Sequence, residues 1–599
     1  MKKEWILFGG MVMTATVVAA AHWPVLSARA LAFDDNEYVT ENRLVLRPSW
    51  ASAGRFFSEV LEPSTARGYY APLTMISLML DSAARSSKDD LQPFHRTNLA
   101  LHMTNTLMVV GLVYMLFHHA WAALFAGLLF GLHPIATESI PWLSERKTML
   151  ATCFALASLL FYVAYAQKSG AGSFGASLAL YVFALLAKPT TTPLPLAMMV
   201  LDWWPMGRGR RLLEKAPFLA IGAVSSVITF ISQSRTAGAT IPAEALPGRE
   251  FLIVCHNLVF YLRNLLWPAG FPGYYPFPES MSLAEPDVLV GVVGAVVLIA
   301  ALLISLRWTR AAMAGWLVFF LLILPTLGVI GFTEVIAANR FLYLPSIGLL
   351  LAFAGLIRWV WDRSYSQVIA RNATRTMIVL VVLGLSAAEA TAARGALSYW
   401  KDGVRLFEHY AETAPRSAKI RYNLGNSHVA QGSLDKAIIA YRQAIQLDPD
   451  YAEAHDNLAI TLAERGQLSE AGVHFKEALR LQPDSPNIHN NLGVALSFQG
   501  RLEEATTHLR EAVRLRPGFA NAHFNLGRVL AQRNRHAEAI KAFQASLQIN
   551  PDDVEVRTAF GQSLEAQGDF DGAVQQYQIV LRLVPNHTEA AKRLAGLRK

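Results

Sequence analysis

Residues 416–449 read RSAKIRYNLGNSHVAQGSLDKAIIAYRQAIQLDP, and residues 450–483 read DYAEAHDNLAITLAERGQLSEAGVHFKEALRLQP. The two stretches match in register, because Leu424 aligns with Leu458 and Ala437 aligns with Ala471. Prolines recur at the same step of 34 residues, at Pro415, Pro449, Pro483, Pro517, Pro551 and Pro585. This period predicts a stack of helix pairs, because a proline ends the second helix of each pair.

Small residues keep the same register and let paired helices approach closely. Glycine follows the repeated apolar residue at Gly425, Gly493, Gly527 and Gly561. A 34-residue period with Leu-Gly, a mid-repeat Ala and a closing Pro is the signature of the tetratricopeptide repeat (TPR). Residues 416–599 are therefore predicted to hold five repeats and a C-terminal capping helix. Residues 396–415 resemble the second helix of a degenerate further repeat, which would connect the solenoid to residues 1–395.

One polar stripe on the repeats is a candidate binding surface. Asparagine precedes the repeated leucine at Asn423, Asn457, Asn491 and Asn525. A ladder of amides can donate to and accept from an extended peptide backbone, so these residues are candidates for binding an acceptor polypeptide. The alternative is that Asn is merely frequent and solvated at this repeat position.

Residues 1–395 have the composition of a membrane protein. The chain of 599 residues is 53% hydrophobic and 16% charged, whereas soluble globular proteins contain about 25% charged residues. These values exclude an ordinary soluble enzyme. Apolar runs long enough to span a bilayer predict about eleven spans, at 5–26, 98–117, 120–136, 148–166, 173–187, 190–205, 216–232, 287–306, 312–331, 341–360 and 376–394. An amphipathic stretch at 251–267 is expected to lie at a membrane interface.

The net charge of +8 reflects membrane topology and not binding of nucleic acid. Basic residues gather in the short loops at 208–215, 307–310 and 358–375, which is the positive-inside pattern. Alternating eleven spans from a cytoplasmic N-terminus places all three loops in the cytoplasm. The same count places the long loops at 28–97 and 233–286 and the repeats outside. The first apolar run is expected to be retained as a helix, because it is longer than a usual signal-peptide core.

Charged and polar residues gather where the predicted spans reach the external side: Asp34, Asp35, His133, Glu138, Glu145, Arg146, Lys147, Lys188, Arg340 and Tyr343. Cations at this side would bind the phosphate of a lipid-linked donor, and an Asp would remove a proton from the acceptor. Asn98, His102 and Asn105 occupy one face of the second span. The structural alternatives are a solvated loop start for the acidic pair and helix packing for the polar stripe.

Short motifs containing these residues occur in a fixed order along the chain. They are Phe33–Asp35, Tyr70–Leu73, Phe94–Asn98, Leu132–Pro134 with Glu138, Ser144–Lys147 and Arg340–Ser346. In these motifs and in its repeats the chain resembles the transmembrane-and-TPR protein O-mannosyltransferases of animals and their bacterial relatives. One departure is Ala71, where relatives often carry a basic residue.

The resemblance implies a GT-C glycosyltransferase that inverts configuration and moves a sugar, usually mannose, from polyprenyl phosphate to Ser or Thr of proteins. Asp34 or Asp35 matches the family's catalytic acidic residue. From their side of the membrane, we expect Arg340 to stabilise the leaving phosphate, with Lys188 or Arg146 helping. Lys147, His133, Glu138, Tyr343 and His102 complete the predicted substrate-binding set. The bacterial relatives suggest an inner-membrane protein with periplasmic repeats.

Two other classes of function stay open from the sequence. A GT-C enzyme could act on a polysaccharide, since sugar and acceptor depend on pocket shape. A non-catalytic membrane scaffold could instead use its repeats to dock periplasmic partners. A transporter is disfavoured, because residues 1–395 show no evident duplication. The sequence contains no metal-ligand motif, so no cofactor and a metal-independent reaction are expected.

Overall fold

The computed structural model describes residues 2–60, 70–87, 89–209, 211–236, 248–268, 273–276, 281–328, 335–363 and 368–597. Parts of the predicted loops at 28–97, 208–215, 233–286 and 358–375, and the end of the predicted span 312–331, lie outside these residues. The chain forms two compact units, Met1–Pro415 and Arg416–Lys599. Each unit is described by itself.

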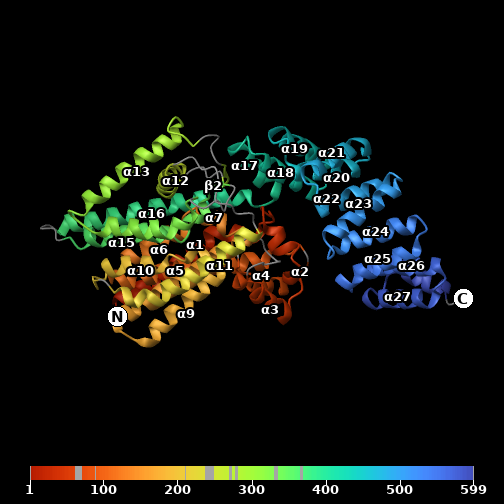
Figure 1. Ribbon diagram of the computed structural model, residues 1–599. Coiled ribbons are helices and arrows are strands. Elements are labelled where there is room, and N and C mark those ends of the chain that lie inside the picture. Colours follow the sequence, from red (N-terminus) through yellow and green to blue (C-terminus); the bar gives the residue numbers. More distant parts are fainter. Residues whose placement is uncertain are drawn as a thin grey trace. The chain divides into compact units, whose positions relative to one another are not determined.

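The C-terminal unit consists of helix pairs that follow one another along an arc (Figure 1). Its helices are α18 (Ala418–Ala430), α19 (Leu434–Leu447), α20 (Ala452–Glu464), α21 (Leu468–Leu481), α22 (Pro486–Phe498), α23 (Leu502–Leu515), α24 (Ala520–Gln532), α25 (His536–Ile549), α26 (Val554–Gln567), α27 (Phe570–Leu583) and α28 (Thr588–Leu597). A Cβ at Gly425 would lie 2.3 Å from the Tyr441 ring of the paired helix. Only glycine permits this approach. The predicted all-α fold with a TPR solenoid is confirmed.

The N-terminal unit is a bundle of long apolar helices. Its helices are α1 (Lys2–His22), α2 (Arg43–Leu46), α3 (Trp50–Ser58), α4 (Pro72–Ala83), α5 (Gln92–Phe117), α6 (Ala120–Leu132), α7 (Ala136–Ser139), α8 (Arg146–Lys168), α9 (Ala171–Ala187), α10 (Leu194–Trp203), α11 (Ala216–Thr236), α12 (Arg249–Leu266), α13 (Pro286–Ser305), α14 (Ala311–Ile323), α15 (Ser346–Trp361), α16 (Val368–Tyr399) and α17 (Gly403–Thr413). Figure 1 shows many of the long helices running side by side.

Six segments of the described chain are long and apolar enough to cross a membrane. They are Glu4–Ser27, Gln92–Phe117, Leu143–Lys168, Leu212–Arg235, Pro286–Ser305 and Val368–Tyr399. Shorter apolar helices are Ala120–Leu132, Ala171–Ala187, Ala311–Thr326 and Ser346–Trp361. The predicted span 190–205 corresponds to α10, which has ten residues. These apolar helices support a membrane protein, and the number of eleven spans stays a prediction.

Short helical turns lie between the long helices. They are η1 (Trp23–Ser27), η2 (Asn36–Thr40), η3 (Leu143–Glu145), η4 (Pro189–Thr191), η5 (Leu212–Lys215), η6 (Leu324–Thr326) and η7 (Asn339–Leu342). Two of them contain candidate site residues, Glu145 in η3 and Arg340 in η7. Strand β1 (Tyr275–Pro276) pairs antiparallel with β2 (Val335–Ala337), with Tyr275 opposite Ala337. Helix α12, predicted to lie at an interface, packs Ile253, Leu258 and Tyr261 into a core shared with α14. The Asn257 amide ties α12 to the backbone before η7 through the carbonyl of Ile336, 2.8 Å away.

Candidate active site

Asp34 lies in the turn that follows η1, and its carboxylate contacts residues that are distant in sequence. Oδ1 accepts hydrogen bonds from Trp142 Nε1 at 3.0 Å and from Ser144 Oγ at 2.6 Å. Oδ2 accepts from Lys147 Nζ at 3.0 Å. The Asp34 side chain remains 32% exposed. Asp34 is therefore an oriented carboxylate that a substrate can still reach.

Asp35, its neighbour in sequence, has a different environment. Its side chain is fully buried, and its two oxygens accept from the backbone N–H groups of Ala32 at 3.0 Å and Ser144 at 2.8 Å. Burial, followed by the adjacent Asp34 charge, raises the pKa of Asp35 to about 8. Asp35 thus fastens the turn to η3, while the Asp34 side chain remains partly exposed.

Three cations and two further carboxylates continue the cluster from Asp34. Glu145 lies 3.7 Å from Lys147 Nζ, 3.3 Å from Lys188 Nζ and 3.3 Å from Arg340 Nε. Arg340 also pairs with Glu138 through Nη1 at 2.5 Å and through its backbone N–H at 3.2 Å. We call Asp34, Glu138, Glu145, Lys147, Lys188 and Arg340 the charge cluster.

The charge cluster alternates in sign and is neutral as a whole when all six groups are ionised. Burial, followed by the neighbouring cations Lys147 and Arg340, lowers the pKa of Lys188 to about 8, although Glu145 acts in the opposite direction. Burial raises the pKa of Glu138, although Arg340 opposes this effect. A phosphate would compete with carboxylates that already accompany the cations.

A small cavity of about 30 Å³ lies beside Lys188 and Arg340. Hydroxyl groups surround it: Thr148, Thr152, Thr190, Thr191 and Thr326 line its wall. The Lys188 ammonium donates to Thr148 Oγ1 at 2.7 Å. Hydroxyls and two cations around one cavity can bind an anionic oxygen.

Arg146 is not part of the charge cluster, although its neighbours in sequence are. Its fully buried side chain donates to Asn98 Oδ1 at 2.5 Å, Ser77 Oγ at 2.6 Å, Asp81 Oδ2 at 2.6 Å and the Phe94 carbonyl at 2.9 Å. These partners belong to α4 and α5. The guanidinium therefore joins three helices, which leaves it little capacity to bind a phosphate.

His102 and Tyr343 pair with each other inside the helix bundle. His102 Nδ1 lies 2.7 Å from Tyr343 Oη, and His102 Nε2 lies 2.9 Å from the Gly131 carbonyl. Asn105 donates to Tyr343 Oη at 3.3 Å. Both side chains are fully buried. The predicted polar stripe of the second span thus packs one helix against others.

His133 lines an apolar cavity of about 720 Å³ between α6, the end of α12, α15 and α16. Its Nε2 lies 3.0 Å from the Leu265 carbonyl. Pro134 and Tyr399 line both this cavity and a smaller one that reaches Glu138. The apolar cavity therefore adjoins the charge cluster.

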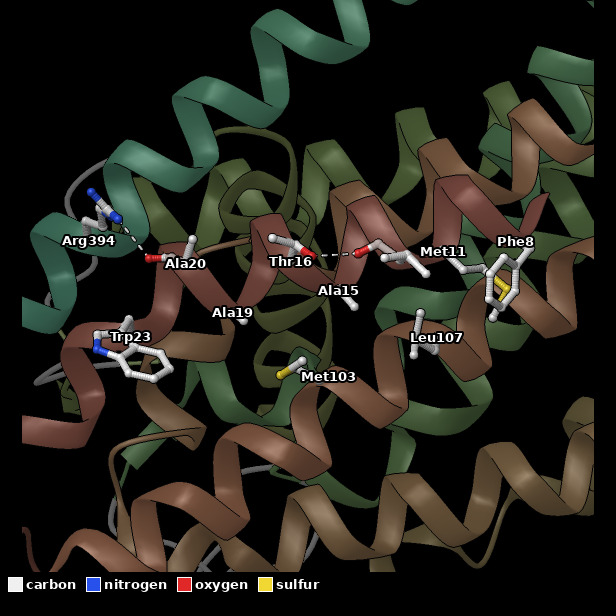
Figure 2. Close-up of a pocket in the computed structure, with 11 residues that line it drawn as sticks. Phe8, Met11, Ala15, Thr16, Ala19, Ala20, Trp23, Met103, Leu107 and Arg394 are labelled. Carbon is white, nitrogen blue, oxygen red and sulfur yellow. Dashed lines mark hydrogen bonds between the residues drawn. The ribbon is translucent and has the colours of Figure 1, made fainter. Parts of the chain in front are cut away.

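A second apolar groove, of about 800 Å³, has no such connection. Figure 2 shows it along α1, with Phe8 and Met11 at one end, Met103 and Leu107 of α5 at its wall and Arg394 at the far end. Arg394 donates to the Ala20 carbonyl at 2.8 Å. Its lining offers no carboxylate, histidine or cysteine, and its one hydroxyl, that of Thr16, donates to the Val12 carbonyl.

The asparagine stripe of the repeats makes contacts from one repeat to the next. Asn457 donates to Tyr422 and Asn426, Asn491 donates to Asp456, and Asn525 donates to Asn490, over distances of 2.8 to 3.0 Å. Asn423 in the first repeat donates instead to the Lys419 carbonyl of its own helix at 2.8 Å. The amide N–H groups therefore fasten neighbouring repeats, and a role in acceptor binding stays a prediction.

Several residues of this region were not predicted from the sequence. Trp142 and Thr148 contact charged members of the cluster, but no local pattern distinguishes them. Ser144 contacts Asp34 and belongs to the Ser144–Lys147 motif, but it was not predicted as a site residue. Glu389 lines the 720 Å³ cavity, and its Oε2 is buried without a hydrogen-bond partner. A carboxyl inside an apolar run is a recognisable signal, so the sequence alone could have identified Glu389. Within the described chain, no group of three or more His, Cys, Asp or Glu could hold a metal ion.

The chain thus combines a unit of apolar helices that are long enough to cross a membrane, a charge cluster near the ends of these helices and a TPR unit. The tetratricopeptide repeat model matches residues 490–554 and 558–597, and a second TPR repeat model matches residues 425–464 and 461–497. The crystal structure of the TPR protein YrrB is 22% identical, covers 32% of this chain and 98% of that chain, and has a TM-score of 0.28.

Relatives over most of the chain are protein O-mannosyl-transferases. F38B6.6 of Caenorhabditis elegans is 24% identical over 438 residues, covering 70% of this chain and 60% of that protein. Human TMTC1 is 26% identical over 466 residues, covering 67% and 50%. The predicted resemblance is confirmed: the chain is a homologue of the transmembrane-and-TPR protein O-mannosyltransferases, and it spans about half to two thirds of their length.

Proposed function

We propose that this protein is a membrane glycosyltransferase of the GT-C type. It transfers a sugar, for which mannose is the first candidate, from polyprenyl phosphate to Ser or Thr hydroxyls of exported proteins. The observation that carries this proposal is the position of Asp34, a partly exposed carboxylate within one cluster of buried cations. The names of the homologues support transfer of mannose to protein.

Asp34 acts as the general base in the proposed reaction. The acceptor oxygen attacks the anomeric carbon, its proton passes to the Asp34 carboxylate, and the bond from carbon to the phosphate oxygen breaks. Arg340 and Lys188 stabilise the negative charge that the leaving phosphate gains. Both bind carboxylates in this structure, so the phosphate takes over part of their hydrogen bonding.

The 720 Å³ apolar cavity is the proposed site of the polyprenyl chain. Its lining is largely apolar, and it adjoins the small cavity beside Glu138. The TPR domain recruits the acceptor polypeptide, as repeat solenoids present extended binding surfaces. In the proposed location, the bacterial inner membrane, the N-terminus is cytoplasmic and the repeats are periplasmic.

The test is transfer of radiolabelled mannose from polyprenyl-phosphate-mannose to endogenous protein in membranes that express the chain. Wild type and Phe319→Ala, a buried change in α14 outside the charge cluster, should label protein, and Asp34→Asn should not. If normally expressed wild type labels no protein with polyprenyl-phosphate-mannose or with any other lipid-linked sugar, the result would favour a non-catalytic scaffold. Labelling of polysaccharide alone would identify the other acceptor class.

The contribution of the repeats to transfer is measured with a truncated chain that ends at Pro415, where the first compact unit ends. A chain that ends at Lys401 also removes α17, which packs against the loop that carries Asp34. The proposal predicts that the chain ending at Pro415 keeps transfer to a short Ser/Thr peptide at high concentration and loses transfer to protein.

A further inference from the structure

The residue before Asp34 has a strained backbone. Phe33 has a φ of 40°, in the left-handed region that a bulky residue adopts only where its surroundings enforce it. Because Phe33 and Asp34 share a peptide bond, relaxation of this torsion would turn the Asp34 carboxylate away from Trp142, Ser144 and Lys147. The orientation of the Asp34 carboxylate therefore depends on the residues that keep Phe33 in this conformation.

Four aromatic rings surround the Phe33 ring. Trp142 lies 5.3 Å from it and Tyr274 lies 5.9 Å from it, between ring centroids. The other two rings belong to α17: Phe407 at 5.6 Å, edge to face, and Tyr410 at 6.4 Å, stacked. These distances lie within the range of favourable aromatic pairs.

The position of Tyr410 is itself fixed by a close approach. Gly273 has a φ of +68°, and a Cβ at this residue would lie 2.2 Å from Tyr410 Cε1. The Tyr410 ring thus occupies the space that any side chain at position 273 would need. Both α17 rings are almost fully buried.

A second contact, through the backbone, joins the turn that carries Asp34 to the segment that leads into α17. The carbonyl of Trp400, just before α17, accepts from the N–H groups of Arg29 and Ala30, each at 3.2 Å. The segment from Trp400 to Tyr410 therefore contacts the turn that carries Asp34 at two points, at Arg29 and Ala30 before Phe33 and at Phe33 itself.

We propose that Phe407 and Tyr410 are positioning residues: α17 keeps Phe33 in its strained conformation and thereby presents the Asp34 carboxylate to the acceptor hydroxyl. This inference rests on the proposed function, because it assigns Asp34 the role of base. It adds that the helix directly preceding the repeats completes the active site of the membrane unit.

The first test measures hydrogen exchange of the full-length protein in detergent and does not depend on activity. In Phe407→Ala, peptides covering residues 28–36 should exchange about tenfold faster, because the loop loses its support. Phe319→Ala is the matched control: Phe319 is equally buried, packs 5.1 Å from Trp316 on α14, and should leave this loop unchanged. Phe407→Leu, which keeps apolar volume without the ring, replaces Phe407→Ala if the latter does not fold.

The second test is a double-mutant cycle on transfer activity. Phe407→Ala should lower kcat about 10- to 100-fold with an unchanged KM for the donor, as expected for a misplaced catalytic group. In the Phe33→Gly background, where the positive φ is unstrained, the same substitution should lower kcat less than about threefold. A purely stabilising contact would give additive effects in both backgrounds.

The outcomes separate this inference from the proposed function. Unchanged exchange of residues 28–36 in a folded Phe407→Ala or Phe407→Leu variant overturns the inference, whatever the activity. Additive losses in the cycle also overturn it. If wild type transfers no sugar from any lipid-linked donor, the proposed function fails and the catalytic role of the loop fails with it, whereas the exchange result still reports whether α17 holds Phe33.

Discussion

Lys147 Nζ lies 3.0 Å from Asp34 Oδ2, although the two residues are 113 positions apart. Together with Trp142 and Ser144 on Oδ1, this ion pair fixes the direction of the carboxylate. In the proposed reaction, three donors orient the base, and the remaining exposure of about one third leaves it accessible to a substrate. The adjacent Asp35 makes its contacts to backbone N–H groups instead.

Substituting asparagine for each aspartate in turn distinguishes the proposed catalytic role of Asp34 from the structural role of Asp35. Asp34→Asn should fold normally and lose transfer by at least about 100-fold, because a general base contributes 10²- to 10⁴-fold. Asp35→Asn, in contrast, should lower the thermal unfolding temperature, because an amide N–H₂ cannot accept a hydrogen bond from the Ala32 N–H. Transfer rates and melting curves in detergent would check both. Full activity in Asp34→Asn with loss only in Asp35→Asn would move the base to Asp35.

The pH profile should reveal Lys188. Its pKa of about 8 means that the ammonium is charged below pH 8 and neutral above it. Transfer should therefore fall as pH rises through about 8, when the phosphate loses one cation. Lys188→Arg stays charged at all accessible pH values and should extend activity to higher pH. If the alkaline decline persists unchanged in Lys188→Arg, Asp35, whose pKa is also about 8, is the titrating group.

Arg146 should matter for folding and not for donor affinity. Arg146→Met leaves Asp81 and Asn98 without their partner inside the helix bundle, and breaking a buried pair costs about 3–5 kcal/mol. The variant should unfold at a clearly lower temperature. The surviving protein should keep its donor KM, whereas Arg340→Met should raise it. A raised donor KM in a stable Arg146→Met variant would return Arg146 to the phosphate site.

Asp456→Asn should stabilise the repeats. Burial raises the pKa of Asp456 to about 6, so between about pH 4 and 6 the folded chain binds more protons than the unfolded chain. Stability from this group therefore increases as pH falls through 6 and is lowest near pH 7. Asn, which occupies the equivalent position at Asn490, keeps an acceptor for Asn491.

The expected gain for Asp456→Asn is about 1–3 kcal/mol at pH 7.5, from a shift of about two pKa units. Urea denaturation of residues 416–599, which form a compact unit, would measure it. The gain should shrink towards pH 4. Equal stability of the two forms at pH 7.5 would contradict a buried, destabilised carboxyl, and Asp450→Asn on the exposed surface is the control.

The sequence by itself determined the repeats and the apolar helices. A 34-residue period and a bilayer-length apolar run are local patterns, and each sets the structure of the segment that carries it. Counting the predicted spans also predicts one side of the membrane for Asp34, Glu138, Glu145, Lys188 and Arg340, because the side that a loop occupies depends on the number of spans before it.

Only the tertiary structure decided which of these residues meet. Lys147 turns to Asp34, but Arg146, one residue earlier on the same helix, turns to α4 and α5, because adjacent helical residues point about 100° apart. The asparagine amides serve contacts between repeats, which depend on how successive helix pairs stack. Phe407 reaches Phe33 across more than 370 residues of chain. No period encodes such a contact, since it arises from packing of complementary surfaces after the helices have formed.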